Sequence, residues 1–454
     1  MVSNSLRDKD LAYTLHPYTN LRAHERKGPL IITRGQGIEV FDESGRGYID
    51  AMAGLWCAAL GFSELRLAEA ARRQMSRLGF YHQFSHKAHD PGIELAARLI
   101  EMAPVPMSKV LFSNSGSEAN DTAIKLIWYF NNALGRPQKK KIIARRRAYH
   151  GVTVAAASLT SLPANSRDFD LPIERFIHTD CPHAYHEAQP GEDDDAFTTR
   201  LAANLEALIL QEGPDTVAAF FAEPVMGAGG VIVPPAGYFP KIQAVCRKYD
   251  ILTLADEVIC GFHRTGNPWG SQTVDFAPDM LSCAKALSSG YLPISALLVN
   301  DRIYQVIADN SAKIGTFGHG YTYSAHPVAA AVALETLNIY AERDIAGYVR
   351  RVAPAMQAQL AALADHPLVG EVRGVGLIGA VELVADKPTR TNFPPAQAVG
   401  PKVVEAMERH GLIGRAMAND SLAFSPPLII TEPELEELFR RARLALDEVA
   451  ATLP

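Results

Sequence analysis

The sequence predicts an α/β protein with a large domain, in which helices cover both faces of a mainly parallel sheet, and a smaller α+β domain built from both ends of the chain. From about residue 93 onward, helical patterns alternate with short apolar runs, which is typical of such a sheet. Before it, residues 38–50 alternate apolar and polar side chains around a glycine-containing turn and predict a β-hairpin. We expect residues 1–65 to belong to the small domain, 66–326 to form the large domain and 327–454 to complete the small one.

The individual elements follow from apolar spacing. Helices are expected over 66–78, 93–102, 117–131, 201–210, 238–249, 327–342, 400–410 and 434–450. Strands are expected over 110–112, 141–144, 154–158, 217–222, 251–255 and within 372–384. Residues 181–195 contain a Pro-Gly pair and four consecutive acidic residues, and they predict an exposed loop.

Composition excludes several classes of protein. The chain has 454 residues with 44 Lys and Arg against 50 Asp and Glu, a net charge of −6 that gives no reason to expect a nucleic-acid partner. The five cysteines are widely spaced without a C-x-x-C pair, so neither a disulfide framework nor a metal cluster is expected. No signal peptide and no apolar run of about 18 residues occurs, so we expect no membrane association and a cytoplasmic location.

One candidate site is the turn from Phe112 to Asn120, where an apolar strand ends, small polar residues follow and a helix begins. The free backbone N–H groups around Gly116 and Ser117 suit a phosphate, and the serine hydroxyls add donors. The alternative is that Ser117 only caps the helix.

Asp256 ends the apolar run 251–255, where a strand-end carboxylate of an α/β sheet meets ligands. The alternative is an aspartate that bonds a nearby turn. Glu257 is expected to point away from it, because successive strand residues face opposite sides.

Lys285 lies among small and apolar neighbours just before a glycine-containing turn. A lysine in a partly dry site has a lowered pKa and can attack a carbonyl carbon. The alternative is a surface lysine whose stem lies along apolar surface.

The run Gly374 to Gly379 satisfies G-x-G-x-x-G, but it continues as the strand-like Ala380 to Val384 instead of a helix. A glycine-rich kink between strands explains it better. An NAD-dependent dehydrogenase is therefore only a remote alternative.

A phosphate cradle, a strand-end carboxylate and a semi-buried lysine together are what pyridoxal phosphate requires: an anchor for its phosphate, an acid partner for its ring nitrogen and an amine for its aldehyde. From about Pro29 to Thr431 the sequence also resembles the class III (omega) aminotransferases of pyridoxal-phosphate fold type I. The resemblance rests on Asn114–Asn120, Tyr149-His150-Gly151, Glu223-Pro224-Val225, Ala255–Val258, Lys285 and Gly320–Ser324.

The resemblance implies a homodimer, or a dimer of such dimers, in which the threonine of the last segment reaches the neighbouring subunit's cofactor. It makes Lys285 and Asp256 the catalytic residues. The cofactor-binding residues that it implies are Ser115, Gly116, Ser117, Tyr149, His150, Glu223, Asp256, Val258, Lys285, Tyr321 and Thr322.

Departures within the family point to its amine:pyruvate branch. Ala228 stands where the branches acting on ornithine, acetylornithine or 4-aminobutyrate usually carry a glutamate, and Gly54–Cys57 also resembles the amine:pyruvate branch. Arg415 falls on the branch's flexible arginine, which binds a substrate carboxylate through two hydrogen bonds and swings out for an uncharged amine. Other departures are Ser85, where an aromatic residue is common, and His263, where glycine is usual. The substrate-binding residues implied are Trp56, Phe84, Tyr149, Ala228 and Arg415.

The expected function is therefore transfer of an amino group from an amine or omega-amino acid to pyruvate or another 2-oxo acid. The closest alternative is a different reaction of the same cofactor, namely a decarboxylase or an aminomutase.

Overall fold

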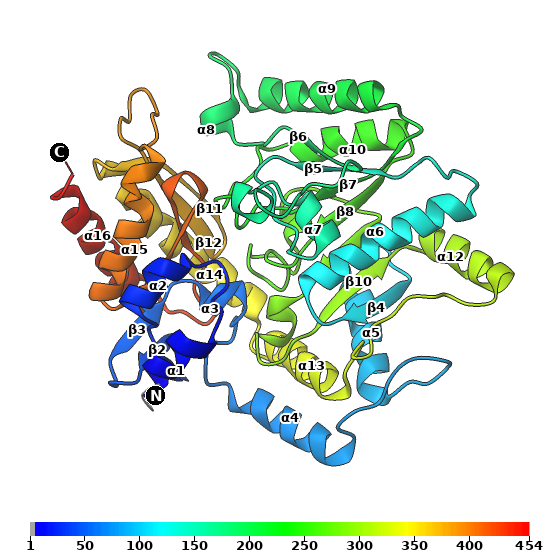
Figure 1. The fold of residues 1–454 in the computed structure, drawn as a ribbon, viewed down its shortest axis with the longest axis horizontal. Coiled ribbons are helices and arrows are strands. Elements are labelled where there is room, and N and C mark those ends of the chain that lie inside the picture. Colours follow the sequence, from blue (N-terminus) through cyan, green and yellow to red (C-terminus); the bar gives the residue numbers. More distant parts are fainter. Residues whose placement is uncertain (1–4, 454) are drawn as a thin grey trace.

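A computed structural model describes residues 5–453 and contains a large, mainly parallel sheet (Figure 1). Its seven strands follow the order β4-β10-β9-β8-β7-β5-β6, and only β10 runs antiparallel to its neighbours. This confirms the predicted fold class. The strands are β4 (Lys109–Ser113), β5 (Lys141–Arg145), β6 (Phe176–Thr179), β7 (Val217–Ala222), β8 (Leu252–Asp256), β9 (Met280–Cys283) and β10 (Ser295–Val299).

Helices cover both faces of this sheet because its central strands are apolar on both sides. In β7, Phe221 packs with α6 (Gly116–Ala133), α7 (Val154–Leu159) and α12 (Asp301–Ile314), whereas its neighbour Phe220 packs with α9 (Asp194–Glu212) and α10 (Tyr238–Lys248). In β5, Ile142 and Ile143 divide between the faces in the same way. Alternate side chains of one strand therefore belong to two separate cores.

The two ends of the chain meet in a second region, which carries two four-stranded sheets. One sheet consists of β1 (Ile32–Gln36), β2 (Glu39–Asp42), β3 (Gly47–Asp50) and β13 (Leu412–Ile413), and β13 pairs in parallel with β3. The other consists of β11 (Val369–Val375), β12 (Ile378–Leu383), β15 (Ser421–Phe424) and β14 (Arg415–Met417). The pairing of β3 with β13 makes one unit from distant parts of the sequence, as predicted. The domain boundaries at 65/66 and 326/327 stay predictions.

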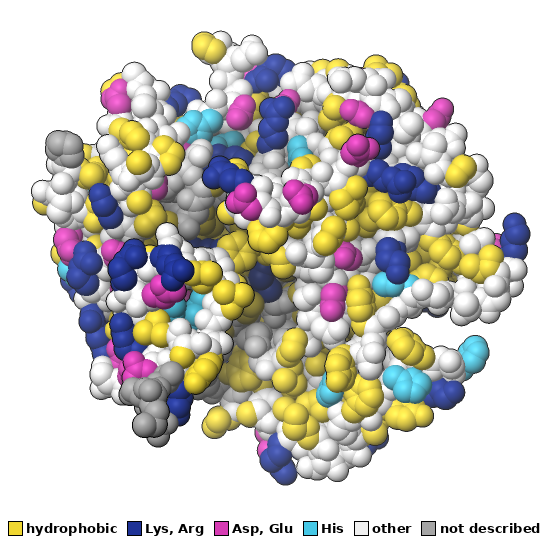
Figure 2. Space-filling model, in the orientation of Figure 1, with side chains coloured by type: hydrophobic (Ala, Val, Ile, Leu, Met, Phe, Trp, Pro, Cys, Tyr) yellow, Lys and Arg dark blue, Asp and Glu magenta, His cyan; other side chains and the backbone are white. Residues whose placement is uncertain are grey.

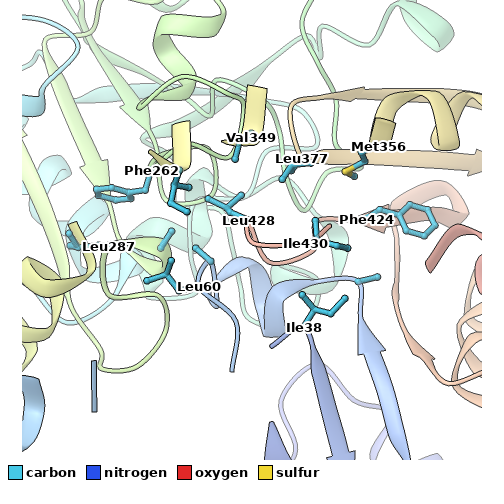
Figure 3. Packing of buried hydrophobic residues seen from close by; sticks show 14 of the residues in the cluster. Ile38, Leu60, Phe262, Leu287, Val349, Met356, Leu377, Phe424, Leu428 and Ile430 are labelled. Atoms are coloured by element: carbon cyan, nitrogen blue, oxygen red, sulfur yellow. The ribbon is translucent and has the colours of Figure 1, made fainter. Parts of the chain in front are cut away.

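The remaining helices are divided between this region and the large sheet (Figure 1). They are α1 (Leu6–Tyr13), α2 (Leu21–Lys27), α3 (Ala53–Trp56), α4 (Leu65–Arg77), α5 (Asp90–Met102), α8 (Ala184–Glu187), α11 (Gly270–Thr273), α13 (Pro327–Glu342), α14 (Ile345–Ala361), α15 (Val399–Arg409) and α16 (Glu432–Ala450). Figure 3 shows Ile38 of the N-terminal part, Phe262 and Leu287 of the central part, and Met356 and Phe424 of the C-terminal part in one apolar cluster. The two regions therefore share a continuous core.

Two predictions about local structure were wrong. Residues 154–158, predicted as a strand, lie in the helix α7. The run is short and apolar, which does not distinguish the two states, and its three consecutive alanines favour a helix. The predicted exposed loop 181–195 begins with buried residues and contains the short helix α8.

The glycine-rich run near residue 376 is the turn between the antiparallel strands β11 and β12, with Gly374 opposite Gly379. A helix does not follow it, so the rejection of a dinucleotide site holds. Within residues 5–453, every helix is too short or too polar to cross a bilayer.

Candidate active site

A cavity of about 450 Å³ lies at the carboxyl ends of the large sheet's parallel strands, which is where ligands bind in open α/β sheets. Residues that follow β4, β5, β7 and β9 line it, together with Asp256 at the end of β8. Nine of the predicted site residues are part of its wall: Ser115, Gly116, Ser117, Tyr149, His150, Glu223, Asp256, Val258 and Lys285. Figure 2 shows hydrophobic side chains gathered around the hollow between the two regions of the molecule.

The amino end of the long helix α6 opens onto this cavity. The Ser115 hydroxyl caps the helix by accepting a hydrogen bond from the N–H of Glu118 at 3.2 Å. Ser117 is not the cap, contrary to the alternative raised from the sequence. Its hydroxyl instead accepts from the N–H of Val152 at 3.1 Å. The first turn therefore keeps its partial positive charge directed at the cavity.

Two glycines allow three segments to meet at this helix end. A Cβ on Gly116 would lie 3.0 Å from a methyl group of Val258, and a Cβ on Gly151 would lie 2.5 Å from the Ser117 hydroxyl. Gly151 also has a φ of +131°, which side chains with a Cβ rarely adopt. The close approach requires glycine at both positions.

The carboxylate of Asp256 is held by three donors. Asn120 Nδ2 donates to Oδ2 at 2.8 Å, His150 Nδ1 lies 2.8 Å from the same oxygen, and the N–H of Val258 donates to Oδ1 at 3.1 Å. The hydroxyl of Ser282 in turn holds the Asn120 amide at 2.8 Å. This network fixes the orientation of the carboxylate on the cavity wall.

The neighbouring carboxylate points elsewhere, as predicted. Glu257 accepts hydrogen bonds from the N–H groups of Gly270 at 2.9 Å and Ser271 at 2.6 Å. Burial raises its pKa to about 7. Glu257 therefore organises the backbone behind β8 and does not face the cavity.

Glu223 connects two loops at the cavity wall. One carboxylate oxygen accepts from the N–H of Tyr149 at 3.1 Å and the other from the N–H of Gly227 at 2.8 Å. Burial raises its pKa. Ala228 lies in the turn that Glu223 holds, which adjoins the cavity without lining it.

Lys285 lies two residues beyond the end of β9 and has a φ of +48°, a conformation that the sequence did not reveal. Burial lowers the pKa of its ammonium group, as expected for a lysine in a dry site. Its Nζ lies 5.7 Å from the centre of the Trp56 ring, and the Arg415 guanidinium lies 5.2 Å from the same ring. Burial also lowers the pKa of Arg415.

Tyr18 was missed at this site. Its ring lies 5.9 Å from the Arg415 guanidinium, and its hydroxyl accepts a hydrogen bond from Asn165 Nδ2 at 2.5 Å. Burial and a hydrogen bond with Tyr18 raise the pKa of Tyr149. Tyr18 lies between two short polar helices far from the predicted motifs, so apolar spacing carried no signal for it.

Besides Ala228, five predicted site residues are not part of the cavity wall: Trp56 and Arg415, and also Phe84, Tyr321 and Thr322. The Tyr321 hydroxyl donates to the carbonyl of Glu118 at 3.3 Å, and Phe84 packs so closely on Gly320 that a Cβ there would lie 2.6 Å from its ring. Thr322 is exposed. Phe84, Tyr321 and Thr322 therefore form a separate surface beside α6.

His263, for which the sequence offered no role, has a φ of +77° and lies edge-on to the Tyr340 ring at 5.5 Å. Burial lowers its pKa to about 4. The left-handed backbone explains why glycine is usual at this position.

Comparison with known proteins places these features in a family. Residues 21–446 match the family model described as Aminotransferase class-III. The chain is 53% identical to "Gamma aminobutyrate transaminase 1, mitochondrial" of Solanum lycopersicum over 92% of its own length and 82% of that protein. It is 51% identical to "Vanillin aminotransferase" of Capsicum chinense over 91% of its length and 90% of that protein. The crystal structure of the omega transaminase from Pseudomonas jessenii in complex with PMP matches with a TM-score of 0.97, at 56% identity, over 99% of both chains.

The predicted cytoplasmic location was wrong by this comparison, because the tomato relative is mitochondrial by name. The prediction rested on unpaired cysteines and on the lack of a secretory signal. Unpaired cysteines indicate a reducing compartment, and they do not distinguish the cytosol from the interior of an organelle.

Proposed function

The chain belongs to the class-III aminotransferase family, and from this premise we propose how its residues carry out the reaction. It is a pyridoxal-phosphate-dependent aminotransferase that moves an amino group to a 2-oxo acid. When bound, the cofactor supplies an aldehyde that takes up the amino group and a ring that accepts the electron pair released at the donor carbon. The observation that carries the assignment of roles is that Lys285 and Asp256 line the same cavity.

The amino end of α6 is the proposed phosphate anchor. Gly116 and Gly151 leave room for close approach, as their Cβ distances indicate, and the hydroxyls of Ser115 and Ser117 lie in the cavity wall. A phosphate at this end gains from both the free N–H groups and the helix dipole. The residues present therefore fit a phosphorylated cofactor.

Asp256 is the proposed partner of the ring nitrogen. Its carboxylate is fixed by Asn120 and His150 before any ligand arrives, so little reorganisation is needed to stabilise a positive charge. Val258, packed against Gly116, is the proposed contact for one face of the ring, and Tyr149 for the other.

Lys285 is the proposed anchor for the cofactor aldehyde and the base of the reaction. Its lowered pKa favours the neutral amine that both roles need. With the cofactor bound, Lys285 would hold it through Nζ, and its free amine would then move the proton at the donor carbon as the base of the reaction. Trp56 excludes water on this side.

Arg415 and Trp56 are proposed to set the donor class. The guanidinium lies over the Trp56 ring and can bind a donor carboxylate through two hydrogen bonds. It is half-buried, with Trp56 and Tyr18 as its aromatic neighbours, so it can also turn away for an uncharged amine. One relative is named for 4-aminobutyrate and the other for an aromatic aldehyde, and we propose that this chain accepts both kinds of amine.

We also propose that the enzyme is a homodimer with shared sites. Thr322 is exposed and lies outside its own chain's cavity. Around it, Phe80, Tyr81, Phe84 and Tyr323 are each exposed by 43% or more, and the Phe80 ring lies edge-on to Tyr323 at 5.6 Å. Such an exposed apolar patch marks an interface.

A half-reaction tests the function and the donor class together. The purified protein should show the absorbance of bound cofactor, and amine donors should bleach it without pyruvate while pyruvate restores it. Arg415→Leu should slow bleaching by carboxylated donors at least tenfold, because a bidentate charged contact is lost, and should leave an uncharged aromatic amine within about threefold. Equal slowing of both donors would refute the role of Arg415. Absence of bleaching by every amine would refute the function.

A further inference from the structure

The N-terminal segment brings two histidines onto one aspartate. Asp10 lies in α1, His16 in the loop that follows, and His24 in α2. His16 Nε2 lies 2.8 and 3.0 Å from the two carboxylate oxygens of Asp10, and His24 Nε2 lies 3.0 Å from Oδ2. The sequence predicted no metal in this protein, but that prediction considered the cysteines and not Asp10, His16 and His24, which are separated along the sequence.

The geometry of this Asp10–His16–His24 cluster suits a metal ion. One ligand atom from each side chain lies within 4.8 Å of the others, and the two rings lie 4.0 Å apart, tilted by 38°. In a tetrahedral zinc site, bonds of about 2.0–2.2 Å place ligand atoms roughly 3.3 Å apart. The nitrogen–oxygen distances therefore need to open by only about half an ångström.

The charged side chains around the Asp10–His16–His24 cluster leave its carboxylate available to a metal ion. Within residues 5–453 the ion-pair partners of Asp10 are these two histidines, and no arginine or lysine pairs with it. The exposed fractions of the side chains are 27% for His16, 19% for Asp10 and 12% for His24. The cluster is thus shielded but reachable from solvent.

A second cluster of similar composition shows the contrast. Ligand atoms of His183, His186 and Glu382 also lie within 4.8 Å of one another, but of the two histidines only His186 bonds to Glu382, and His183 Nε2 bonds to Glu371 at 2.7 Å. There the Arg373 guanidinium lies 2.9 Å from Glu382, and Arg147 lies 2.9 Å from His183 Nδ1. These cations neutralise the carboxylate and repel a metal ion, so this cluster is the internal comparison.

We propose that Asp10, His16 and His24 bind a divalent first-row transition-metal ion, with Zn²⁺ as the representative, and that water completes its coordination. A donor set of two imidazoles and one carboxylate favours these ions over Mg²⁺ and Ca²⁺, which prefer oxygen ligands alone. The bound ion joins α1, the following loop and α2 into one unit. That loop carries Tyr18, whose ring lies 5.9 Å from the Arg415 guanidinium, so metal binding fixes a side chain beside Arg415.

The test uses the cofactor-loaded enzyme after treatment with a chelator and removal of the chelator. Calorimetric titration with Zn²⁺ should show one ion bound per chain, and the ion should raise the melting temperature, because it binds the folded state. His16→Gln, His24→Gln and Asp10→Asn should each weaken binding at least tenfold and abolish the rise. Melting curves without metal establish that each variant is folded.

Two matched variants serve as controls. His410→Gln removes another surface histidine that pairs with one carboxylate, Glu448, at 2.9 Å, and His186→Gln alters the second cluster. Both should bind Zn²⁺ like the wild type. The proposal is overturned if the wild type binds no stoichiometric ion, if the Asp10–His16–His24 variants bind normally, or if His186→Gln abolishes binding instead.

Discussion

Replacing Asp256 by asparagine keeps the shape of the side chain and removes its charge. The amide oxygen can take the place of Oδ2 and still accept from Asn120 and His150. Its NH₂ group must then face the N–H of Val258 across 3.1 Å. One hydrogen bond is lost and two donors oppose each other, which costs roughly 1–3 kcal/mol of stability.

The effect on turnover is expected to be larger than a packing defect explains. Removing one preorganised electrostatic contact from an active site costs about 3 kcal/mol of barrier lowering, and 1.36 kcal/mol corresponds to a tenfold change in rate. Asp256→Asn should therefore lower kcat/KM about a hundredfold or more. The rate is measured per bound cofactor with a donor amine and pyruvate, so that loss of folded or loaded enzyme does not count as loss of chemistry.

The adjacent carboxylate offers a matched control. Glu257→Gln replaces a carboxyl group by an amide one residue away, but Glu257 binds the backbone of Gly270 and Ser271 and faces away from the cavity. Its rate per bound cofactor should stay within about threefold of the wild type, since no preorganised contact to the reacting atoms is lost. A change below tenfold in Asp256→Asn, or equal slowing in both variants, would refute the role assigned to Asp256.

Three further changes have defined outcomes. Lys285→Ala should reduce turnover at least about 10⁴-fold, since it removes both the anchor and the base; wild-type rates and cofactor absorbance in this variant would contradict the assignment. Gly151→Ala should lower the free energy of unfolding by about 1–3 kcal/mol and should weaken cofactor binding, measured by fluorescence titration. The control is Gly191→Ala, because Gly191 also has a positive φ, +86°, but has open space around it. This control should lose less stability and bind the cofactor normally. Burial raises the pKa of Glu257 from 4.5 to about 7, so its contribution to stability is complete below the lower value and is lost as the pH rises through the higher one. Glu257→Gln resembles the protonated state at every pH, so its free energy of unfolding should not contain this pH-dependent loss. In denaturant unfolding, the wild type's lead in free energy of unfolding over Glu257→Gln should therefore shrink by up to about 3 kcal/mol between pH 5 and pH 8. A lead that stays constant would contradict this.

Features that depend on local sequence pattern could be predicted from the sequence. Features whose conformation is decided by tertiary contacts could not. The parallel sheet and the helix over 327–342 follow from apolar spacing, which survives in any context. The run 154–158 was ambiguous in itself, and contacts beside α6 keep it helical. The left-handed φ of Lys285 is imposed by the chain around it and leaves no signature in residue type.

The same distinction applies to the site. Strand-end position and motif order predicted roles for Asp256 and Lys285, and the structure places both in the wall of one cavity; the roles themselves stay predictions. Tyr18 could not be found in this way, because its approach to Arg415 joins residues almost 400 positions apart and depends on the tertiary fold. Thr322 is exposed and lies outside the cavity wall of its own chain, so its role in a shared site stays a proposal.

Three carboxylates lie at the ends of neighbouring strands, and the groups that donate hydrogen bonds to each of them distinguish their roles. Both oxygens of Glu223 and of Glu257 bind backbone N–H groups, so each is fully used in holding loops. Asp256 instead bonds mainly to side chains, Asn120 and His150, which hold it in place in the cavity wall. Burial raises the pKa of both glutamates, and a neutral form still accepts hydrogen bonds from the backbone. Only the role proposed for Asp256 requires the negative charge itself, and the comparison of Asp256→Asn with Glu257→Gln tests that difference directly.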